Sequence, residues 1–202
     1  MAHYFTENQT DIKTEEKDIE FDFCDKTFTF TTDHGVFSKA HVDLGTKTLL
    51  EAIEVPRNAS VLDLGCGYGV IGTVIAACKE ADVTMGDVNE RAVELAKRNV
   101  MANGVTAKVF KSNGLSKIKG TFDIIVSNPP IRIGKPRLYP MFKDVHKALN
   151  DDGIFWLVVR KKQGAASAAK YLRTMFDVNI VRKHKGYHVM ACKKNIDGLT
   201  TL

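Results

Sequence analysis

The stretch at residues 61–72 constrains this chain most, because it reads as a buried strand, a glycine-rich turn and a helix start. Its sequence is VLDLGCGYGVIG. The apolar residues from Val61 to Leu64 are typical of a parallel strand covered on both faces. Asp63 is an acid within this run, where a carboxylate without a partner is costly. Glycines allow a tight turn and a close approach to a ligand. Together these features predict a nucleotide-type site at the carboxyl end of a sheet.

The glycine turn alone leaves the ligand open. Residues 67–72 match the pattern G-x-G-x-x-G, and Asp87 lies 20 residues after Gly67, as a dinucleotide site requires. A tight strand-to-helix turn that binds no ligand is a further alternative. The rest of the chain has to decide between these interpretations.

The composition is that of an ordinary globular protein. The 202 residues suffice for one α/β domain, and 44% hydrophobic with 26% charged residues indicates neither disorder nor a membrane protein. We find no apolar run long enough to span a bilayer and no secretory signal at the N-terminus. The four cysteines are scattered, without a C-x-x-C pair, so we expect no disulfide and no metal site. We therefore expect a cytoplasmic protein without a membrane or metal partner, either a monomer or a homodimer.

Positive charge is concentrated near the C-terminus. The formal net charge is +5, and ten Lys or Arg residues lie within residues 160–194 against the single acid Asp177. Such a segment is either a solvated surface that keeps the protein soluble or a patch that binds phosphates. Charge alone does not separate the two.

Hydrophobic periodicity predicts the order of the elements. Alternation predicts an N-terminal hairpin from residues 19–23 and 26–31, with Cys24 and Asp25 at the turn. The expected helices occupy residues 41–54, 70–78, 90–102 (with Asn89 as N-cap), 138–150 and 164–176. The further expected strands are residues 61–64, 83–87, 107–110, 122–127, 153–159, 178–181 and 187–192.

The last two strands set the topology. The connection at residues 182–186 is too short for a parallel crossover, so it implies an antiparallel hairpin. The predicted fold is α/β, with a doubly wound, mostly parallel seven-stranded sheet and an antiparallel C-terminal strand at its edge. We expect a single domain over residues 1–202, made of an N-terminal extension (1–40) and a core (41–202). The antiparallel strand argues against a standard dinucleotide fold, whose sixth strand stays parallel.

Asp87 ends the strand that follows the glycine turn along the chain. A carboxylate at this point can accept two hydrogen bonds from a ribose diol. Its position and spacing favour this role over that of an acid stabilised by the dipole of the next helix. Asn113 and Gly114 end the following strand, where they either contact a base edge or simply form a turn.

Asn128, Pro129, Pro130 and Ile131 follow the strand at residues 122–127, which a doubly wound sheet places beside the glycine turn. The prolines fix the backbone and remove donors, leaving a rigid corner with carbonyl groups and one amide side chain. These acceptors can hold both hydrogens of an NH2 group and direct its lone pair at an electrophile, without a strong base. A proline turn after a strand is the alternative for this motif taken alone.

Several short motifs along the chain fit one family pattern. They are residues 3–5 (HYF), 35–38 (GVFS), 43–46 (DLGT), 63–69 (DLGCGYG), 128–132 (NPPIR), 161–165 (KKQGA) and 185–187 (KGY). The chain resembles the class I S-adenosylmethionine-dependent methyltransferases. Within them it resembles the RsmC-type 16S ribosomal RNA guanine-N2 methyltransferases, in a short one-domain form. The resemblance implies a Rossmann-like methyltransferase fold and transfer of a methyl group to guanine N2 of small-subunit ribosomal RNA, or of a 30S assembly intermediate.

The resemblance also implies S-adenosylmethionine as cofactor and assigns residues to it. The amino-acid part would be surrounded by Asp63, Gly65, Cys66, Gly67 and Gly69, and the methionine end approached by Gly45 and Thr46. The ribose would contact Asp87, and the adenine Val88, Asn113 and Gly114. Asn128 would reach the cofactor and, with the Pro129 carbonyl, hold the target amine.

The substrate side departs from the family pattern. Many N-P-P enzymes have an aromatic residue next, which stacks on the flipped base, whereas this chain has Ile131. Stacking would then come from Phe37 or from the plane of Arg132, with Ser38 nearby. The residues expected to contact RNA are Arg132, Lys135, Arg137 and the basic C-terminal third.

Three other functions fit parts of the pattern. A protein methyltransferase of the N-P-P type could modify a glutamine side-chain amide with the same acceptors. A non-catalytic RNA-binding assembly factor could retain the fold, but the presence of Asp63, Asp87 and Asn128 argues against this function. A NAD-dependent enzyme explains neither the N-P-P motif nor the terminal hairpin.

Overall fold

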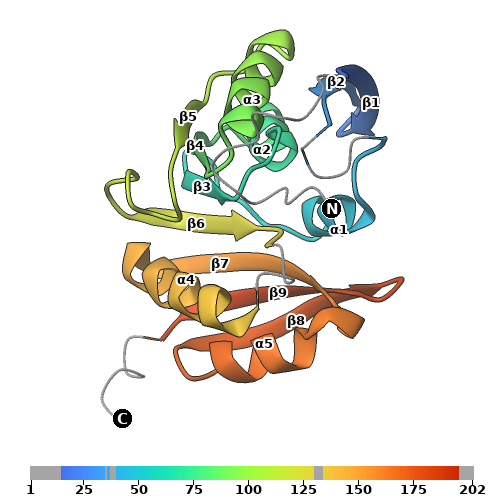
Figure 1. Ribbon diagram of the computed structural model, residues 1–202. Helices are drawn as coiled ribbons and strands as arrows, with labels where there is room; N and C mark the ends of the chain where they lie inside the picture. The colour runs from blue at the N-terminus through green and yellow to red at the C-terminus, as the bar shows by residue number, and fades with distance from the viewer. Residues whose placement is uncertain (1–14, 35, 37–39, 130–133, 196–202) are drawn as a thin grey trace.

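One seven-stranded sheet forms the centre of the protein, with helices on both of its faces (Figure 1). The computed structural model describes residues 15–34, 36, 40–129 and 134–195. From edge to edge the strands are β5 (Lys108–Lys111), β4 (Asp82–Asp87), β3 (Ser60–Leu64), β6 (Phe122–Ser127), β7 (Leu149–Arg160), β9 (Tyr187–Lys194) and β8 (Phe176–His184). Among these described strands β9 alone runs in the direction opposite to the other six. The mostly parallel sheet with an antiparallel C-terminal strand is confirmed, but β9 lies between β7 and β8, so the edge belongs to β8.

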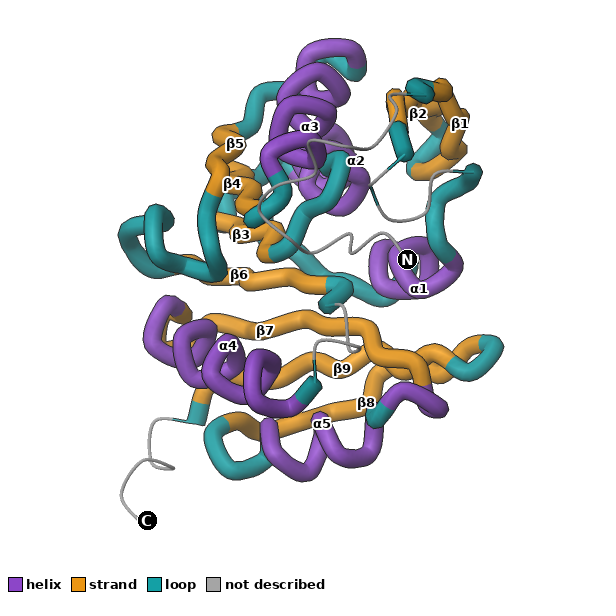
Figure 2. Tube along the Cα trace, viewed as in Figure 1, coloured by secondary structure: helices purple, strands orange, loops and turns teal. Residues whose placement is uncertain are grey.

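Alternation along the strands divides the core into two layers. Val61 and Val126 face α1 (Leu44–Leu50), α2 (Val70–Lys79) and α3 (Glu90–Ala102). Their neighbours Leu62 and Ile125 face the opposite layer, with α4 (Lys135–Ala148) and α5 (Ala165–Leu172). Figure 2 shows the two helix layers on either side of the sheet. The apolar strand sequences follow from burial on both faces.

Element boundaries differ from the prediction where a cap or a proline decides them. The helix expected at residues 41–54 is shorter, because Asp43 caps α1 by accepting the Thr46 N–H at 2.9 Å. The helix expected at 138–150 begins earlier, at Lys135, where Pro136 fits the first turn. The helix expected at 164–176 ends at Leu172, and a short 3₁₀ turn (Lys161–Gln163) precedes it. The predicted Asn89 cap is confirmed, since its side chain accepts the Arg91 N–H at 3.0 Å.

The predicted N-terminal hairpin is present as β1 (Lys17–Phe23) and β2 (Lys26–Thr32), an antiparallel pair separate from the main sheet. Its turn residues have positive φ angles, 51° at Cys24 and 55° at Asp25. Two such residues form the type I′ geometry that matches the twist of a hairpin, here without the usual glycine. Phe28 and Phe30 from β2 are buried in the same apolar layer as α2 and α3.

Asn99 of α3 and Asn103, the residue that ends this helix, attach the hairpin by pairing with its backbone. The Asn99 amide accepts the Thr31 N–H at 2.8 Å and donates to the Thr31 carbonyl at 3.0 Å. The Asn103 amide pairs with Thr29 in the same manner, at 3.1 and 2.8 Å. Asn99 also donates to the Tyr68 carbonyl in the glycine turn at 2.8 Å. The buried Asn99 therefore links the hairpin to the turn.

The Asn99→Ala variant is expected to lose about 2–4 kcal/mol of the free energy of unfolding, because one buried and two partly buried backbone groups lose their partner. Urea denaturation followed by circular dichroism measures this loss. Asn103→Ala is the matched control: it removes the same kind of pairing where the hydrogen bonds, those to Thr29, are exposed to solvent, so its cost should stay below about 1 kcal/mol. Equal losses in the two variants would contradict the role of burial.

Candidate functional site

A cleft of about 1130 Å³ opens at the carboxyl ends of the central strands. Leu64, Asp87 and Ser127 line it and end β3, β4 and β6. β3 has β4 on one side and β6 on the other, so the chain connections change direction beside it. The Ser127 hydroxyl donates to the Leu64 carbonyl at 2.7 Å and ties the two strand ends together. Such a switch point is where doubly wound sheets bind ligands.

The glycine turn forms one wall of the cleft. Gly65 and Gly67 have φ angles of 75° and 56°, and a Cβ on either would meet no atom within 4 Å. Both residues line the cleft, so their backbone is open to a ligand. Gly69 (φ 92°) instead faces Ala96, whose Cβ would lie 3.1 Å from an added Cβ. The absence of a side chain at Gly69 therefore allows the start of α2 to pack closely against Ala96 of α3. Gly69 is the N-cap residue of α2 and provides no side-chain hydrogen bond to the helix.

Asp63 lies fully buried behind this turn. Its Oδ2 accepts the Gly72 N–H at 2.8 Å, whereas its Oδ1 has no hydrogen-bond partner within the described part of the chain. Burial raises the pKa of Asp63 to about 7; the Gly72 N–H opposes this shift, and the Asp87 carboxylate adds to it. An unpartnered carboxylate oxygen beneath a ligand cleft is an acceptor that a cationic or hydroxyl group can use.

Asp63 makes stability depend on pH in a defined direction. Its folded-state pKa of about 7 lies above the ordinary value of 3.8, so between these values the folded protein holds a proton that the unfolded chain has lost. The contribution of Asp63 to stability therefore falls as the pH rises from about 4 to about 7.

The Asp63→Asn variant keeps an acceptor for Gly72 and removes the charge. Wild type should lose stability as the pH rises from 4 to 8, and the variant should not. The free energy of unfolding of the variant minus that of wild type is therefore expected to increase by on the order of 2–4 kcal/mol over this range. Denaturant titrations at several pH values measure this difference. Asp152→Asn, at an exposed position, should show no comparable trend. A constant difference between Asp63→Asn and wild type across the range would contradict the shifted pKa.

Asp87 ends β4 opposite the glycine turn. Its Oδ2 accepts the Gly67 N–H at 2.8 Å, and its Oδ1 accepts the Asn89 N–H at 2.9 Å. Burial raises the pKa of Asp87, and the hydrogen bonds from the Asn89, Gly67 and Val88 backbone oppose that shift. Each carboxylate oxygen has a further lone pair, so the group can also accept from ligand hydroxyls.

Asn128 follows β6 and lines the cleft with Pro129. Its Nδ2 donates to Asp43 Oδ2 at 2.7 Å and to Thr46 Oγ1 at 3.0 Å. The Tyr187 hydroxyl donates to the other oxygen of Asp43 at 3.2 Å. Burial and the Asp43 carboxylate raise the pKa of Tyr187, so its hydroxyl stays protonated as a donor. The start of α1, the end of β6 and the start of β9 thus meet at one network.

The structure brings together most of the residues predicted for cofactor binding. Those that line the cleft are Thr46, Gly65, Cys66, Gly67, Asp87, Val88, Asn113, Gly114 and Asn128, with Pro129 beside them. Among the described residues, Gly45, Asp63, Gly69 and Lys135 are not part of the lining. The predicted Phe37, Ser38, Pro130, Ile131 and Arg132 lie outside the described residues.

The sequence alone indicated no site role for Asp43 or Tyr187, and Arg160 only as part of the basic segment expected to contact RNA; all three also line the cleft. Asp43 and Tyr187 belong to the DLGT and KGY motifs. The family motifs therefore include both residues, but they do not indicate what either side chain does. Arg160 ends β7 and pairs with Tyr187 across the strands, with its guanidinium 5.6 Å from the centre of the tyrosine ring. These residues come from separate parts of the sequence, and only folding shows that they meet.

Two general properties of the described residues bear on possible partners. No helix among them is both long enough and apolar enough to cross a membrane. The same residues contain no group of three or more His, Cys, Asp or Glu side chains arranged to hold a metal ion.

Comparison with protein families and with relatives gives the following matches. A family model described as Methyltransferase small domain matches residues 27–191. A Bacillus subtilis protein named Uncharacterized protein YbxB is 42% identical over 198 residues, which cover 95% of this chain and 98% of that protein. Ribosomal RNA small subunit methyltransferase C of Haemophilus influenzae is 41% identical over 112 residues, 55% of this chain. The match covers only 34% of that longer relative.

Solved structures share the fold. The T. thermophilus 16S rRNA N2 G1207 methyltransferase (RsmC), in complex with AdoMet and guanosine, matches with a TM-score of 0.81 and 25% identity. The match covers 89% of this chain and 51% of that chain. A methyltransferase from Pyrococcus furiosus matches with a TM-score of 0.65 at 24% identity, which shows the fold alone.

Proposed function

The chain belongs to the Methyltransferase small domain family, and from this premise we propose that it transfers a methyl group from S-adenosylmethionine to an exocyclic amino group. The proposed target is guanine N2 of small-subunit ribosomal RNA. The observation that carries the proposal is the Asn128 side chain at the cleft, with its Nδ2 bound to Asp43 and Thr46. Support also comes from relatives named as ribosomal RNA methyltransferases and from the RsmC structure with AdoMet and guanosine.

The cleft fits this cofactor. The Asp87 carboxylate lines the cleft and is suited to a ribose diol, and Asp63 adds an unpartnered oxygen, Oδ1, that lies behind the glycine turn and not in the cleft lining. The open backbone at Gly65 and Gly67 lets the ligand come close to the turn. When bound, S-adenosylmethionine supplies a methyl group on a positively charged sulfur.

The residues after β6 orient the amine rather than deprotonate it. We place one amine hydrogen on the Asn128 side-chain oxygen and the other on the Pro129 carbonyl, so that the nitrogen lone pair points at the methyl carbon. With the cofactor bound, methyl transfer would form the N–C bond and break the C–S bond, the sulfur would keep the electron pair, and the amine would release its proton to water. This is catalysis by orientation and by preorganised dipoles.

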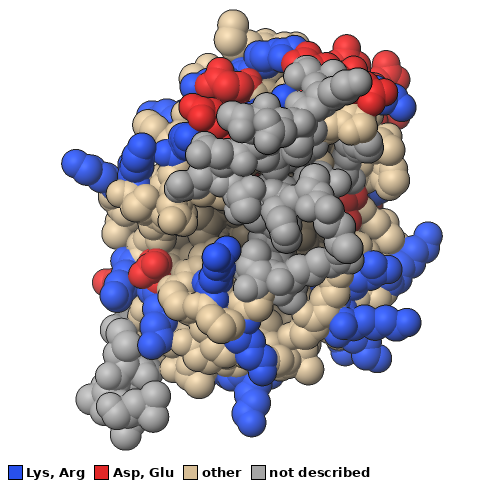
Figure 3. Space-filling model, viewed as in Figure 1, with Lys and Arg blue, Asp and Glu red and all other residues tan. Residues whose placement is uncertain are grey.

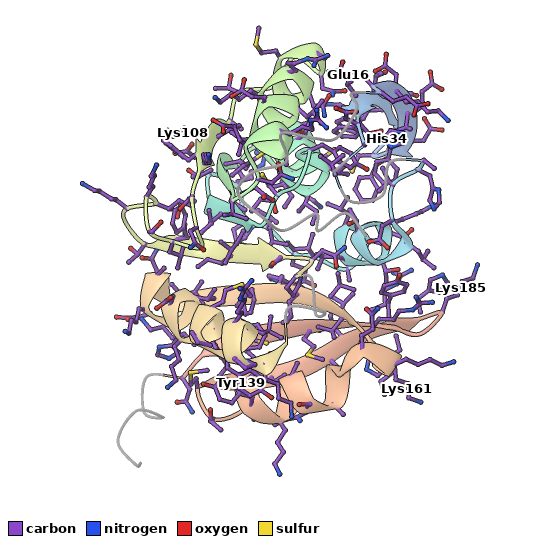
Figure 4. The ribbon with its side chains drawn as sticks, in the orientation of Figure 1. Glu16, His34, Lys108, Tyr139, Lys161 and Lys185 are labelled. Atoms are coloured by element: carbon purple, nitrogen blue, oxygen red, sulfur yellow. The ribbon has the colours of Figure 1, made fainter. Side chains whose placement is uncertain are left out.

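Positive side chains lie around the cleft and suit an RNA backbone. Arg137 and Arg160 line the cleft itself. Lys161 follows β7, and Lys185 lies in the turn between β8 and β9; Figure 4 shows both on the same side of the molecule, extending away from the ribbon. Figure 3 shows Lys and Arg gathered there, whereas many of the acids lie at the top of the same view, near the hairpin. This distribution favours the RNA-binding interpretation of the basic C-terminal segment.

Charge reversal at Lys161 and Lys185 should weaken RNA binding and flatten its salt dependence. If each lysine contacts one phosphate, the slope of log K against log salt should fall in magnitude by roughly 1.4–1.8 for the double variant. Fluorescence anisotropy with 16S ribosomal RNA fragments at several salt concentrations measures the slope. Lys108→Glu is the control, because Lys108 lies on β5, on the opposite side of the view in Figure 4. An unaltered slope in the double variant would place the RNA site elsewhere.

A methyl-transfer assay with three acceptors in parallel tests the proposed function. The protein is incubated with labelled S-adenosylmethionine and naked 16S ribosomal RNA, 30S particles or total protein, each from cells that lack the gene. We expect label in RNA, and nucleoside analysis should identify N2-methylguanosine. Label in glutamine side chains would instead support the protein methyltransferase alternative. Binding of RNA without any transfer, at saturating cofactor, would support the non-catalytic assembly factor.

A further inference from the structure

We propose that Asp43 is a positioning residue, which holds the amide of Asn128 so that its side-chain oxygen, and not its nitrogen, faces the target amine. This inference rests on the proposed function and adds to it a residue outside the N-P-P motif. Asp43 lies 85 positions before Asn128 in the sequence, and the fold brings the two side chains to 2.7 Å.

An asparagine amide needs partners to define its orientation. Its oxygen and nitrogen ends have nearly the same shape, so rotation by half a turn costs little unless hydrogen bonds prevent it. A carboxylate only accepts hydrogen bonds, so Asp43 Oδ2 requires the Asn128 nitrogen on its side. Thr46 Oγ1 accepts from the same nitrogen at 3.0 Å. With the nitrogen engaged on that side, the oxygen of the planar amide is directed to the other.

Orientation matters because the reverse arrangement opposes the reaction. With the amide turned round, an NH2 group would face the NH2 group of the target, donor against donor. The target would lose one of its two acceptors, and its lone pair would no longer be directed at the methyl carbon. A misplaced reacting group of this kind lowers the rate of the chemical step more than the affinity.

Asp43 is itself held from two sides. As the N-cap of α1, its Oδ2 also accepts the Thr46 N–H at 2.9 Å. Its Oδ1 accepts from the Tyr187 hydroxyl at 3.2 Å. The tyrosine ring is fixed in turn: a Cβ on Gly45 would come within 2.8 Å of it, and Arg160 lies over its face. Gly45 thus allows Tyr187 to approach the cap.

Two substitutions at Asp43 separate positioning from capping. Serine and asparagine are both good N-cap residues, so both should keep α1. Asp43→Asn can still offer an oxygen to Thr46 and Asn128, and an amide nitrogen to the Tyr187 hydroxyl. Asp43→Ser is one atom shorter, so it caps the helix but loses its reach to Asn128 and Tyr187. A loss of activity in the serine variant that the asparagine variant recovers identifies positioning.

The first measurement is the kinetics of methyl transfer to the RNA acceptor. In Asp43→Ser we expect kcat to fall roughly 10- to 100-fold, with KM for RNA and cofactor affinity within about threefold of wild type. In Asp43→Asn most of this loss should be recovered. Wild-type kcat in the serine variant overturns the proposal, as does an equal loss in both variants. A melting temperature lowered only in the serine variant, with cofactor affinity lost in parallel with kcat, also overturns it.

The second measurement needs no substrate. In the ¹⁵N–¹H spectrum, the side-chain NH2 signals of Asn128 can be assigned by their absence in Asn128→Ala. These protons should exchange slowly with water in wild type and Asp43→Asn, and rapidly in Asp43→Ser. The exposed Asn179 on β8 gives the reference for an unheld amide. Exchange at the Asn179 rate in wild type overturns the proposal, whereas a wild type that holds the amide yet methylates no acceptor contradicts only the proposed function.

Discussion

The Asn128→Ala variant is expected to transfer methyl groups about 100- to 1000-fold more slowly than wild type, with affinity for S-adenosylmethionine within about threefold. The side-chain oxygen is proposed to hold the target amine, so its removal affects the transition state. Most of the cofactor contacts we propose lie at the glycine turn and Asp87, which the substitution leaves intact.

Single-turnover kinetics with saturating cofactor measure the rate, and calorimetry measures the affinity. Asn179→Ala removes the same side chain from an exposed position on β8 and should leave both quantities unchanged. Unchanged turnover in Asn128→Ala would remove Asn128 from the mechanism. A parallel loss of cofactor affinity would assign it to cofactor binding instead.

The Asp87→Ala variant is expected to bind S-adenosylmethionine more weakly by about 2–4 kcal/mol, roughly 30- to 700-fold in Kd. Two effects combine: the ribose hydroxyls lose a charged acceptor, and the Gly67 and Asn89 N–H groups lose the carboxylate that orders the turn. Calorimetry with S-adenosylmethionine measures the affinity.

The control is Asp82→Ala, at the other end of β4. The Asp82 side chain is exposed and forms a surface ion pair with Lys108, at 3.3 Å, so cofactor affinity should stay unchanged. Affinity for NADH should be undetectable in both variants and in wild type. Wild-type affinity for S-adenosylmethionine in Asp87→Ala would show that the ribose binds elsewhere.

Local patterns were enough to predict the order and type of the elements. Strand alternation, helix periodicity and the Asn89 cap act over a few residues, and the structure follows them. Local signals were also enough for the glycine turn, since positive φ at Gly65, Gly67 and Gly69 is what such a sequence allows. Local signals predicted helix ends less accurately. The helix expected to start at residue 41 begins only after its cap, Asp43.

The order of the last two strands in the sheet could not be predicted from local sequence. A short connection required an antiparallel hairpin, and β8 and β9 form one. Which of the two strands pairs with β7 depends on how their apolar faces meet the sheet. In the structure β9 takes the inner place, with Val189, Met190 and Cys192 fully buried. This choice is a matter of packing between distant segments and has no short-range pattern.

Residue patterns along the chain were sufficient to predict a methyltransferase-like sheet, a glycine turn with Asp63 and Asp87 near it, and the amide of Asn128 after the neighbouring strand. These features depend on residues close together along the chain. The hydrogen bonds that hold the Asn128 amide, in contrast, are visible only in the folded protein. Asp43 meets residues 85 and 144 positions away, Asn128 and Tyr187, and Asn99 joins a hairpin 68 positions away to the turn. Such hydrogen bonds form only after the apolar layers bring the elements together, so no local pattern encodes them.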